Sequence, residues 1–363
     1  MRSFTFLMAG GGTGGHVIPS LAVARELRLR GHGAVFIGTR QGLEARLVPA
    51  AGFPIAWIEI GGLKSVGFGQ TSRTLLQLPA SVLRARKIAL ERKGAGVFSM
   101  GGYVAGPVML AARWLRLPTI LMEPNAMPGL TNRRMARFVD RALLSFAEAR
   151  PYFPPGRSEI TGLPVRSEFF AIPEKPREET ITVLITGGSR GSRTLNLAAR
   201  AMWPLLERSG VKMRLLHQCG YDSYEQLAAE FAATGLPGEV REFIDDMPGA
   251  FAAADLVVCR SGAGAVAELA AAGKPSILVP FPFAADQHQL RNAEAMRKSG
   301  AARLVTDSEM SGERLLQEIL SATGDHPKLR EMGAAARAHA NPDAAKRAVD
   351  LLLSFAAGKG KNG

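Results

Sequence analysis

The most informative stretch of the sequence is Ala9-Gly10-Gly11-Gly12-Thr13-Gly14-Gly15-His16. An apolar run at residues 4–8 leads into it, and a helical pattern at 21–29 follows it. A glycine loop between a strand and a helix exposes backbone N–H groups, which bind anions such as phosphate. Pro19 suits the first turn of that helix, where its missing N–H costs nothing. We therefore expect a phosphate-binding loop; the competing interpretation is a tight turn that only packs helix on strand.

The composition is that of an ordinary globular protein with room for two domains. The chain has 363 residues, of which 47% are hydrophobic, 21% charged and 7% aromatic. Its two cysteines, Cys219 and Cys259, form no paired motif, which favours a reduced, cytoplasmic setting. No apolar run has the length of a membrane span, and the start lacks the pattern of a signal peptide. We expect a chain that is soluble or lies on a membrane surface.

The formal net charge of +13 predicts anionic partners. The basic residues are spread along the chain, without a basic tail or the aromatic and basic signature of an RNA-binding sheet. This distribution argues against nucleic acid. Phosphorylated substrates and anionic lipid remain as the candidate partners.

Predicted strands alternate with predicted helices along the first half of the chain, a pattern typical of a parallel sheet covered on both faces. The strands are expected at 34–38, 55–60, 95–100, 119–122 and 139–146, and the helices at 43–50, 70–93, 104–116 and 131–137. Prolines and glycines then crowd residues 151–180, which we interpret as a linker.

The opening pattern returns after this segment. A strand at 181–186 runs into the glycine loop Gly187-Gly188-Ser189-Arg190-Gly191, and a helix follows at 195–207. Further strands are expected at 213–217, 240–244, 255–259, 276–279 and 302–305. The sequence therefore predicts two doubly wound parallel-sheet domains, with ligands bound in a cleft beyond the carboxyl ends of the strands.

A nicotinamide dehydrogenase is one alternative. Gly10, Gly12 and Gly15 satisfy the G-x-G-x-x-G pattern after a strand. The second strand ends in Gly38-Thr39-Arg40, without the acid that binds the NAD ribose, although Arg40 suits the 2′-phosphate of NADP. A dehydrogenase has no need of the second glycine loop. An NADP-dependent oxidoreductase therefore stays as the lesser alternative.

A third loop, Arg260-Ser261-Gly262-Ala263-Gly264, also lies between a strand and a helix. Amides, a hydroxyl and a guanidinium there suit a diphosphate. Glu268, on the helix that follows, can accept hydrogen bonds from a ribose hydroxyl pair. The competing interpretation is an acid that complements the helix dipole.

His16 is a candidate for proton transfer because its usual pKa lies near neutrality, although a lone histidine is more often structural. The spacing of His, Cys, Asp and Glu resembles no zinc site, and the sequence has no Asp-x-Asp pair for a divalent ion. We therefore expect no metal site and no required cofactor. Amides and arginines would neutralise a bound diphosphate.

Residues 70–93 place apolar and basic side chains on one helix: Leu75, Leu76, Leu78, Val82 and Leu83 with Arg73, Arg84, Arg86 and Lys87. Trp114 is a further apolar candidate in the same domain. The pattern suits a helix that inserts its apolar face into the surface of an anionic bilayer. It also suits an amphipathic helix packed on the sheet.

The order of several motifs resembles the MurG family of bacterial cell-wall glycosyltransferases over essentially the whole chain. These motifs are Gly11–His16, Met100-Gly101-Gly102-Tyr103, Glu123-Pro124-Asn125, Gly162-Leu163-Pro164-Val165-Arg166, Gly187-Gly188-Ser189, Phe243-Ile244-Asp245-Asp246-Met247, Cys259-Arg260-Ser261-Gly262, Asp286-Gln287-His288-Gln289 and Asn292-Ala293. Several independent motifs in the family's order make the resemblance specific.

The resemblance implies a GT-B fold, with an acceptor and membrane-facing domain at 1–163 and a UDP-N-acetylglucosamine domain at 164–342. A last helix near 343–363 would pack back on the first domain. It also implies inverting transfer of N-acetylglucosamine to the C4 hydroxyl of undecaprenyl-pyrophosphoryl-N-acetylmuramyl-pentapeptide, converting lipid I to lipid II. That chemistry places the protein peripherally on the cytoplasmic face of the inner membrane.

The family's site residues transfer to this sequence by motif. In the second domain the Ile244 backbone would contact uracil, Glu268 the ribose, and Ser189 the diphosphate, with Arg166 assisting. The other members of the set are Ser261, Gly262, Ala263, Gly264 and Ala265 at the diphosphate, Asn125, His288 and Gln289 at the sugar, and Thr13, Gly14 and Gly15 between the donor and acceptor phosphates.

His16 is the first choice of general base and Glu123 the second. The sequence departs from the family in two places. Pro124 stands where relatives often have glutamine, and residues 264–267 lack the usual threonine and serine, which puts one hydroxyl contact to the diphosphate in doubt. A UDP-sugar epimerase of the same fold and a non-enzymatic membrane adaptor are the other hypotheses.

Overall fold

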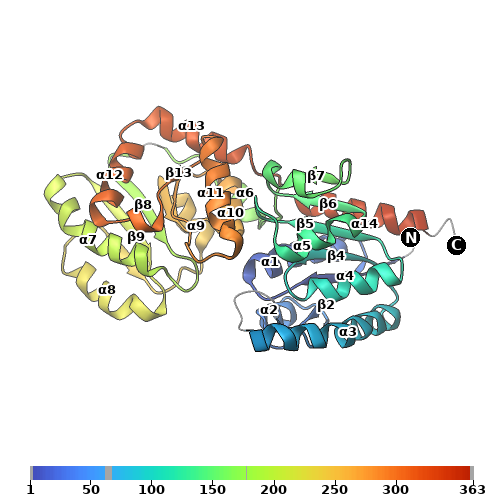
Figure 1. The fold of residues 1–363 in the computed structure, drawn as a ribbon. Helices are drawn as coiled ribbons and strands as arrows, with labels where there is room; N and C mark the ends of the chain where they lie inside the picture. Colours follow the sequence, from blue (N-terminus) through green and yellow to red (C-terminus); the bar gives the residue numbers. More distant parts are fainter. Residues whose placement is uncertain (1–2, 62–67, 177, 360–363) are drawn as a thin grey trace. The chain divides into compact units, whose positions relative to one another are not determined.

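The computed structural model describes residues 3–61, 68–176 and 178–359, and it divides into two compact units. Unit 1 comprises Met1–Val165 with Asn341–Gly363, and unit 2 comprises Arg166–Ala340. The limits expected from sequence, after residue 163 and after residue 342, each differ from these by two residues. Each unit contains one parallel sheet with helices packed on it (Figure 1).

The sheet of unit 1 has the strand order β3-β2-β1-β4-β5-β6-β7, and every pairing in it is parallel. Its strands are β1 (Thr5–Gly10), β2 (Gly33–Gly38), β3 (Ile55–Trp57), β4 (Gly94–Gly101), β5 (Thr119–Glu123), β6 (Arg141–Leu144) and β7 (Ser158–Ile160). The helices of this part are α1 (Gly14–Leu29), α2 (Glu44–Ala50), α3 (Phe68–Glu91), α4 (Ala105–Trp114), α5 (Leu130–Met135), η1 (Ala136–Phe138) and η2 (Ala147–Tyr152). Aliphatic residues of β1, β4 and β5 are fully buried and form the centre of the core, as expected for strands covered on both faces.

The sheet of unit 2 has the order β10-β9-β8-β11-β12-β13, again with parallel pairings only. Its strands are β8 (Ile181–Thr186), β9 (Met213–Gln218), β10 (Gly238–Arg241), β11 (Leu256–Cys259), β12 (Ser276–Leu278) and β13 (Arg303–Leu304). The helices are α6 (Ser167–Phe170), α7 (Arg193–Ser209), η3 (Tyr221–Ser223), α8 (Tyr224–Ala232), α9 (Met247–Ala253), α10 (Ala263–Ala272), η4 (Ala285–Gln287), α11 (His288–Lys298), η5 (Asp307–Glu309), α12 (Gly312–Thr323) and α13 (His326–Arg337). The two doubly wound parallel sheets predicted from sequence are confirmed.

Helix α1 begins earlier than its apolar pattern predicts. It starts at Gly14, inside the glycine stretch, so the glycines supply its first turn. Pro19 is therefore an interior residue of α1 and not a first-turn residue, as the sequence had suggested. Because proline has no backbone N–H, α1 lacks one helical hydrogen bond at this position, which destabilises the helix.

The linker expected at 151–180 is wrong in part, because the segment contains regular structure. Strand β7 extends the sheet of unit 1 by pairing with β6, and α6 opens unit 2 with Phe169 fully buried. Phe169 meets Phe251 at a ring-centroid distance of 5.2 Å. The prolines of this segment therefore separate short elements that pack on each unit.

The last helix, α14 (Ala344–Lys359), belongs to unit 1, as the resemblance implied (Figure 1). It packs against α1, β4 and β5, with Val349 and Leu352 fully buried. Arg347 forms a two-pronged ion pair with Glu159 of β7 at 2.7 and 2.8 Å, and Asp350 pairs with Arg30 at 2.5 Å. Within the described residues, the structure has no helix that is both long and apolar enough to span a bilayer.

Candidate active site

The glycine loop of unit 1 joins β1 to α1 at the carboxyl edge of the sheet. Thr13 is the N-cap residue of α1; its backbone is extended and its side chain makes no capping bond. The amide of His16 already bonds to the Thr13 carbonyl at 3.1 Å. The amides of Gly14 and Gly15 therefore belong to the first turn, where N–H groups lack helical partners and can meet an anion. These are the positions that the sequence predicted for phosphate contact.

The imidazole of His16 is oriented by the loop that precedes it. Its Nδ1 lies 3.2 Å from the carbonyl oxygen of Gly11 and 3.5 Å from Thr13 Oγ1. A carbonyl only accepts, so Nδ1 carries the hydrogen in this contact and the neutral ring has its lone pair on Nε2. Gly102, with φ +80°, lies against the ring, and a Cβ at that residue would come within 3.3 Å of Nδ1. The tautomer that results is the one a general base needs.

Glu123, the last residue of β5, is 1% exposed and holds the following loop together. Its Oε1 accepts from the backbone N–H of Asn125 at 2.9 Å and from Asn125 Nδ2 at 3.2 Å. Its Oε2 accepts from the Gly129 N–H at 3.1 Å and from Asn132 Nδ2 at 2.7 Å. Burial raises the pKa of Glu123 to about 7, and these four donors oppose the rise because they favour the ionised form.

The same network fixes Asn125, which the sequence predicted at the sugar. Both of its nitrogens donate to Glu123, so the carboxylate sets the direction of the Asn125 side chain. A Cβ on Gly101, which has φ +86°, would come within 2.5 Å of Asn132 Oδ1. A glycine is therefore needed at the end of β4, where its backbone approaches Asn132 of α5.

The first glycine loop of unit 2 follows β8 and carries Ser189 on its exposed side. Its shape is fixed from beneath: Thr186 Oγ1 accepts from the Gly188 N–H at 3.2 Å, and Gln218 Nε2 donates to the Gly188 carbonyl at 2.9 Å. Gly191, with φ +74°, has no room for a Cβ because the Cys219 carbonyl occupies that position. Neutral groups thus hold the loop while Ser189 stays exposed.

The second loop of unit 2 leads into α10. Ser261 is fully buried, and its hydroxyl donates to the Gln289 carbonyl at 2.8 Å. Asn292 Nδ2 donates to the Ser261 carbonyl at 3.1 Å, so the starts of α10 and α11 are joined. Gly262 is the N-cap of α10, without a side-chain capping bond, and the half-buried residues 262–265 form the first turn. The backbone amides of this turn lack helical partners, so they are suited to bind an anion.

The guanidinium of Arg260 does not serve this turn, and the prediction that it converges there is wrong. Its Nη1 donates to the carbonyls of Val279 and Pro280 at 3.1 and 3.2 Å and pairs with Asp307. Arg260 therefore connects the end of β11 to the segments after β12 and β13.

Gln289 and His288 open α11 after Asp286 and Gln287, two non-glycine residues with φ of +53° and +52°. Backbone in this region is strained for such residues and occurs most often at functional sites. Gln289 Oε1 accepts from the Phe281 N–H at 2.9 Å, which leaves its amide NH₂ as the donating side. His288 Nδ1 lies 2.6 Å from the Ala285 carbonyl, so its other ring nitrogen points away from that bond.

Ile244 and Glu268 occupy two further positions of unit 2. Ile244 lines a pocket of about 620 Å³ beside β9, β10 and α9. Glu268, on α10, lies 3.8 Å from Arg166 Nη2 through its Oε1. Burial raises the pKa of Glu268 to about 7, and the positive charge of Arg166 opposes that rise.

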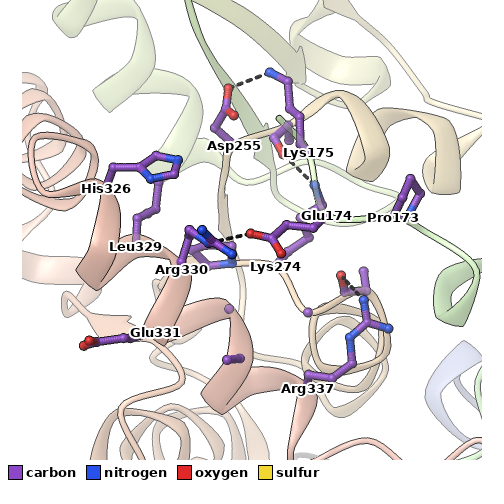
Figure 2. Close-up of a pocket in the computed structure, with 16 residues that line it drawn as sticks. Pro173, Glu174, Lys175, Asp255, Lys274, His326, Leu329, Arg330, Glu331 and Arg337 are labelled. Carbon is purple, nitrogen blue, oxygen red and sulfur yellow. Dashed lines mark hydrogen bonds and ion pairs between the residues drawn. The ribbon is translucent and has the colours of Figure 1, made fainter. Parts of the chain in front are cut away.

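Another pocket, of about 500 Å³, lies at the amino-terminal edge of the unit 2 sheet (Figure 2). Its cations have partners nearby: Lys175 donates to Asp255 at 2.7 Å, Arg330 to Glu174 at 2.5 Å, and Lys274 to the Ala254 carbonyl at 2.8 Å. None of the site residues predicted from sequence lines it. The pocket is therefore separate from the loops that carry the candidate site.

Sequence reasoning missed several residues that position the candidate site. Glu44, Asn132 and Gln218 are buried polar residues, and each bonds to the backbone of a site loop or to Glu123. Nothing in composition or periodicity marks them, although Glu44 begins a helix just after the second strand. Among the described residues, the structure has no cluster of three or more His, Cys, Asp or Glu side chains suited to a metal.

Comparisons with known proteins agree with this architecture. The family model for the glycosyltransferase family 28 N-terminal domain matches residues 6–144, and that for the C-terminal domain matches residues 182–348. The crystal structure of Acinetobacter baumannii MurG has a TM-score of 0.83 and 32% identity to this chain, covering 97% of this chain and all of that one. The paired sheets and their loops thus define a glycosyltransferase of the GT-B fold.

A curated relative identifies the family more narrowly. The UDP-N-acetylglucosamine–N-acetylmuramyl-(pentapeptide) pyrophosphoryl-undecaprenol N-acetylglucosamine transferase of Solibacter usitatus (strain Ellin6076) is 60% identical over 352 residues, 97% of this chain and 96% of that protein. The chain belongs to glycosyltransferase family 28 and, within it, to the MurG N-acetylglucosaminyltransferases of peptidoglycan synthesis.

A Listeria monocytogenes structure provisionally described as a UDP-N-acetylglucosamine 2-epimerase has a TM-score of 0.67 at 13% identity, covering 96% of this chain and 95% of that one. At that identity the likeness extends to the fold alone.

Proposed function

We propose that this chain transfers N-acetylglucosamine from UDP-N-acetylglucosamine to the C4 hydroxyl of the muramyl sugar of lipid I, forming lipid II with inversion at the anomeric carbon. The observation that carries the proposal is the 60% identity to a transferase of that name over nearly the whole chain. The site loops of both units support it, because the N–H groups of a first helical turn lack helical partners and suit phosphate groups.

Unit 2 is the donor-binding unit in this proposal. Glu268 accepts hydrogen bonds from the ribose hydroxyls, and the Ile244 backbone contacts uracil beside its pocket. The diphosphate meets Ser189 and the start of α10, at Gly262, Ala263, Gly264 and Ala265, while Arg166 adds positive charge beside Glu268. Ser261, which the resemblance also placed at the diphosphate, instead holds this turn in place, because its buried hydroxyl donates to the Gln289 carbonyl. Gln289, with its donating amide, and His288 contact the sugar.

The charge that develops during the reaction explains why amides suffice at the diphosphate. Breaking the anomeric bond leaves negative charge on the departing UDP and positive charge on the sugar ring. Donors fixed before the reaction stabilise that negative charge more in the transition state than in the ground state. Loops held rigid from beneath, as at Gly188 and Ser261, meet this requirement.

Unit 1 is the acceptor-binding unit. Thr13, Gly14 and Gly15 bind phosphate, and His16 takes the proton of the attacking hydroxyl through Nε2, since Nδ1 faces the Gly11 carbonyl. Glu123 is the second candidate base. Its two oxygens face four N–H donors, which favours a positioning role toward Asn125 over proton transfer.

A membrane surface is the expected location because lipid I is anchored there. On α3 and α4, which pack together, Leu83, Leu90 and Trp114 are exposed, and Arg86 lies over the Trp114 ring at 4.8 Å. Apolar groups beside cations suit the interface of an anionic bilayer. Three other predicted patch residues, Arg73, Leu75 and Leu76, have side chains outside the described part of the chain. We propose peripheral attachment to the cytoplasmic face of the inner membrane.

Product formation tests the reaction. The protein, supplied with UDP-N-acetylglucosamine and lipid I in detergent, is expected to release UDP in step with formation of a lipid-linked disaccharide. Without lipid I, UDP release is expected to fall to background. A sugar nucleotide converted to an epimer without a new glycosidic bond would instead identify an epimerase.

The role of His16 is tested by H16A. Because a positioned base contributes about 10²- to 10⁴-fold, we expect kcat to fall by at least about 100-fold while UDP-N-acetylglucosamine still binds. H32A is the matched control in the same unit, since His32 lies before β2 at the opposite edge of the sheet. A kcat for H16A within a few-fold of wild type would rule out His16 as the base.

The pH dependence of donor binding tests Glu268. Ribose hydroxyls donate to the ionised carboxylate, so protonation below the pKa of about 7 must oppose binding. Calorimetry should find UDP-N-acetylglucosamine affinity rising between pH 6 and 8 and levelling above pH 8, with a limiting slope of about tenfold per pH unit at low pH. We expect E268Q to bind more weakly and without this slope, and E313Q, an exposed control, to behave as wild type. Unchanged affinity in E268Q would contradict the ribose contact.

Membrane attachment is tested by cosedimentation with vesicles containing phosphatidylglycerol. Binding should weaken as salt rises, and L83E should reduce partitioning roughly tenfold or more, because burying a leucine contributes about 1.5–3 kcal/mol. Leu197, which is 52% exposed on α7 of unit 2, gives the matched control L197E. Equal losses in L83E and L197E, or no vesicle binding by wild type, would refute attachment through α3.

A further inference from the structure

A buried carboxylate lies beneath the glycine loop of unit 1. Glu44, the first residue of α2, is 1% exposed. Its Oε2 accepts from the backbone N–H of Gly12 at 2.8 Å, and its Oε1 accepts from the Thr39 N–H at 2.9 Å and from Thr39 Oγ1 at 3.0 Å. Glu44 thus joins the loop after β1 to the end of β2.

The chain around Glu44 leaves space for this carboxylate and for little else. A Cβ on Gly11 would lie 2.6 Å from Oε1, and one on Gly38 would lie 2.6 Å from Glu44 Cγ. A Cβ on Gly42 would also collide with the carboxylate. Glycines at these three positions therefore let the backbone approach Glu44 closely enough for its hydrogen bonds.

Tyr103 extends the network to the loop after β4. Its hydroxyl lies 3.1 Å from Thr39 Oγ1, and a Cβ on Gly12 would come within 2.9 Å of its ring. Gly12 itself has φ +93°, a conformation that glycine adopts readily. The ring on one side and the Glu44 carboxylate on the other hold the Gly12 peptide in one orientation.

The orientation of Gly12 bears on both functional parts of the loop. Gly11, the residue before it, presents the carbonyl that faces His16 Nδ1. Thr13, the residue after it, begins the turn whose amides belong to Gly14 and Gly15. Because the Gly12 N–H bonds to Glu44, it is directed into the protein, and the phosphate must be met by the amides that follow.

We propose that Glu44 is a positioning residue for acceptor binding and proton transfer, which orients the first-turn amides and His16 through the Gly12 peptide. The inference rests on the proposed function of the loop. Glu44 reaches neither substrate nor His16 directly, and it acts through the backbone.

The chemistry of the site requires a carboxylate. All three groups that face Glu44 donate hydrogen bonds, and both of its oxygens accept. A glutamine would turn an NH₂ group toward Gly12 N–H or toward Thr39, where donor would face donor. An aspartate would be one methylene too short to reach Gly12 from the same backbone.

Steady-state kinetics with lipid I and UDP-N-acetylglucosamine tests the proposal in E44Q and E44D. We expect kcat/KM for lipid I to fall about 10- to 100-fold in both variants, because a small misplacement of binding groups is costly. The KM for UDP-N-acetylglucosamine and the calorimetric affinity for UDP should stay within about twofold of wild type, since the nucleotide loops belong to unit 2. If the substitutions only destabilised the enzyme, the amount of active protein would fall, and the kinetics would not show a loss confined to lipid I.

Two further variants make the test decisive. E159Q is the matched control. It removes a carboxylate of β7 that pairs with Arg347 of α14, away from the glycine loop, and it should leave the KM for lipid I and the KM for UDP-N-acetylglucosamine unchanged. T39V removes one donor to Glu44 and the contact to Tyr103, and a threefold or larger rise in the lipid I KM is expected even if E44Q does not fold.

Normal lipid I kinetics in E44Q, or in T39V where E44Q does not fold, would overturn the inference. Absence of product with the wild-type chain would instead overturn the proposed function.

Discussion

Hydrogen bonds between the backbone of the site loops and buried side chains are the interactions on which both sets of loops depend. A loop that binds phosphate must leave some N–H groups unbonded and still keep one conformation, two demands that conflict in a flexible, glycine-rich segment. In unit 1, Glu44 and Glu123 satisfy both demands by accepting the amides that face inward, Gly12 in one case and Asn125 and Gly129 in the other. The amides that face outward are then fixed as a consequence.

Unit 2 meets the same demands with neutral groups. Thr186 and Gln218 hold the loop of Ser189, while Ser261 and Asn292 hold the start of α10. The difference suits the donor site, because the groups that hold these loops add no negative charge next to amides that must stabilise the departing diphosphate. Glu268, the acid nearest to this turn on α10, is offset by Arg166.

The sequence predicted the fold well because the central strands of the two parallel sheets, such as β1, β5, β8 and β11, carry their own apolar signal. The predictions that were wrong, for the linker and for the start of α1, failed for physical reasons. Strand β7 is short, half-exposed and surrounded by prolines, so its pattern matches a linker until its pairing with β6 is seen. The glycines at the start of α1 have low helix propensity, and only the tertiary structure makes them helical. At the site, motif resemblance marked the loops and the residues proposed to contact substrate. The position of Glu44 depends on a contact 32 residues away in the chain, and the role of Glu123 depends on how the loop after β5 folds back on it, so neither could be predicted from the sequence.

The return of α14 to unit 1 has a consequence for synthesis on the ribosome. Unit 2 is continuous in the chain, so all of its strands and helices are synthesised before residue 341. Unit 1 is completed later, because side chains that cover part of its core, Val349 and Leu352 among them, are synthesised after unit 2. Most of unit 1 is therefore synthesised before the helix that covers it, and until α14 follows, the apolar surface under α14 stays exposed on the nascent chain, where it favours aggregation.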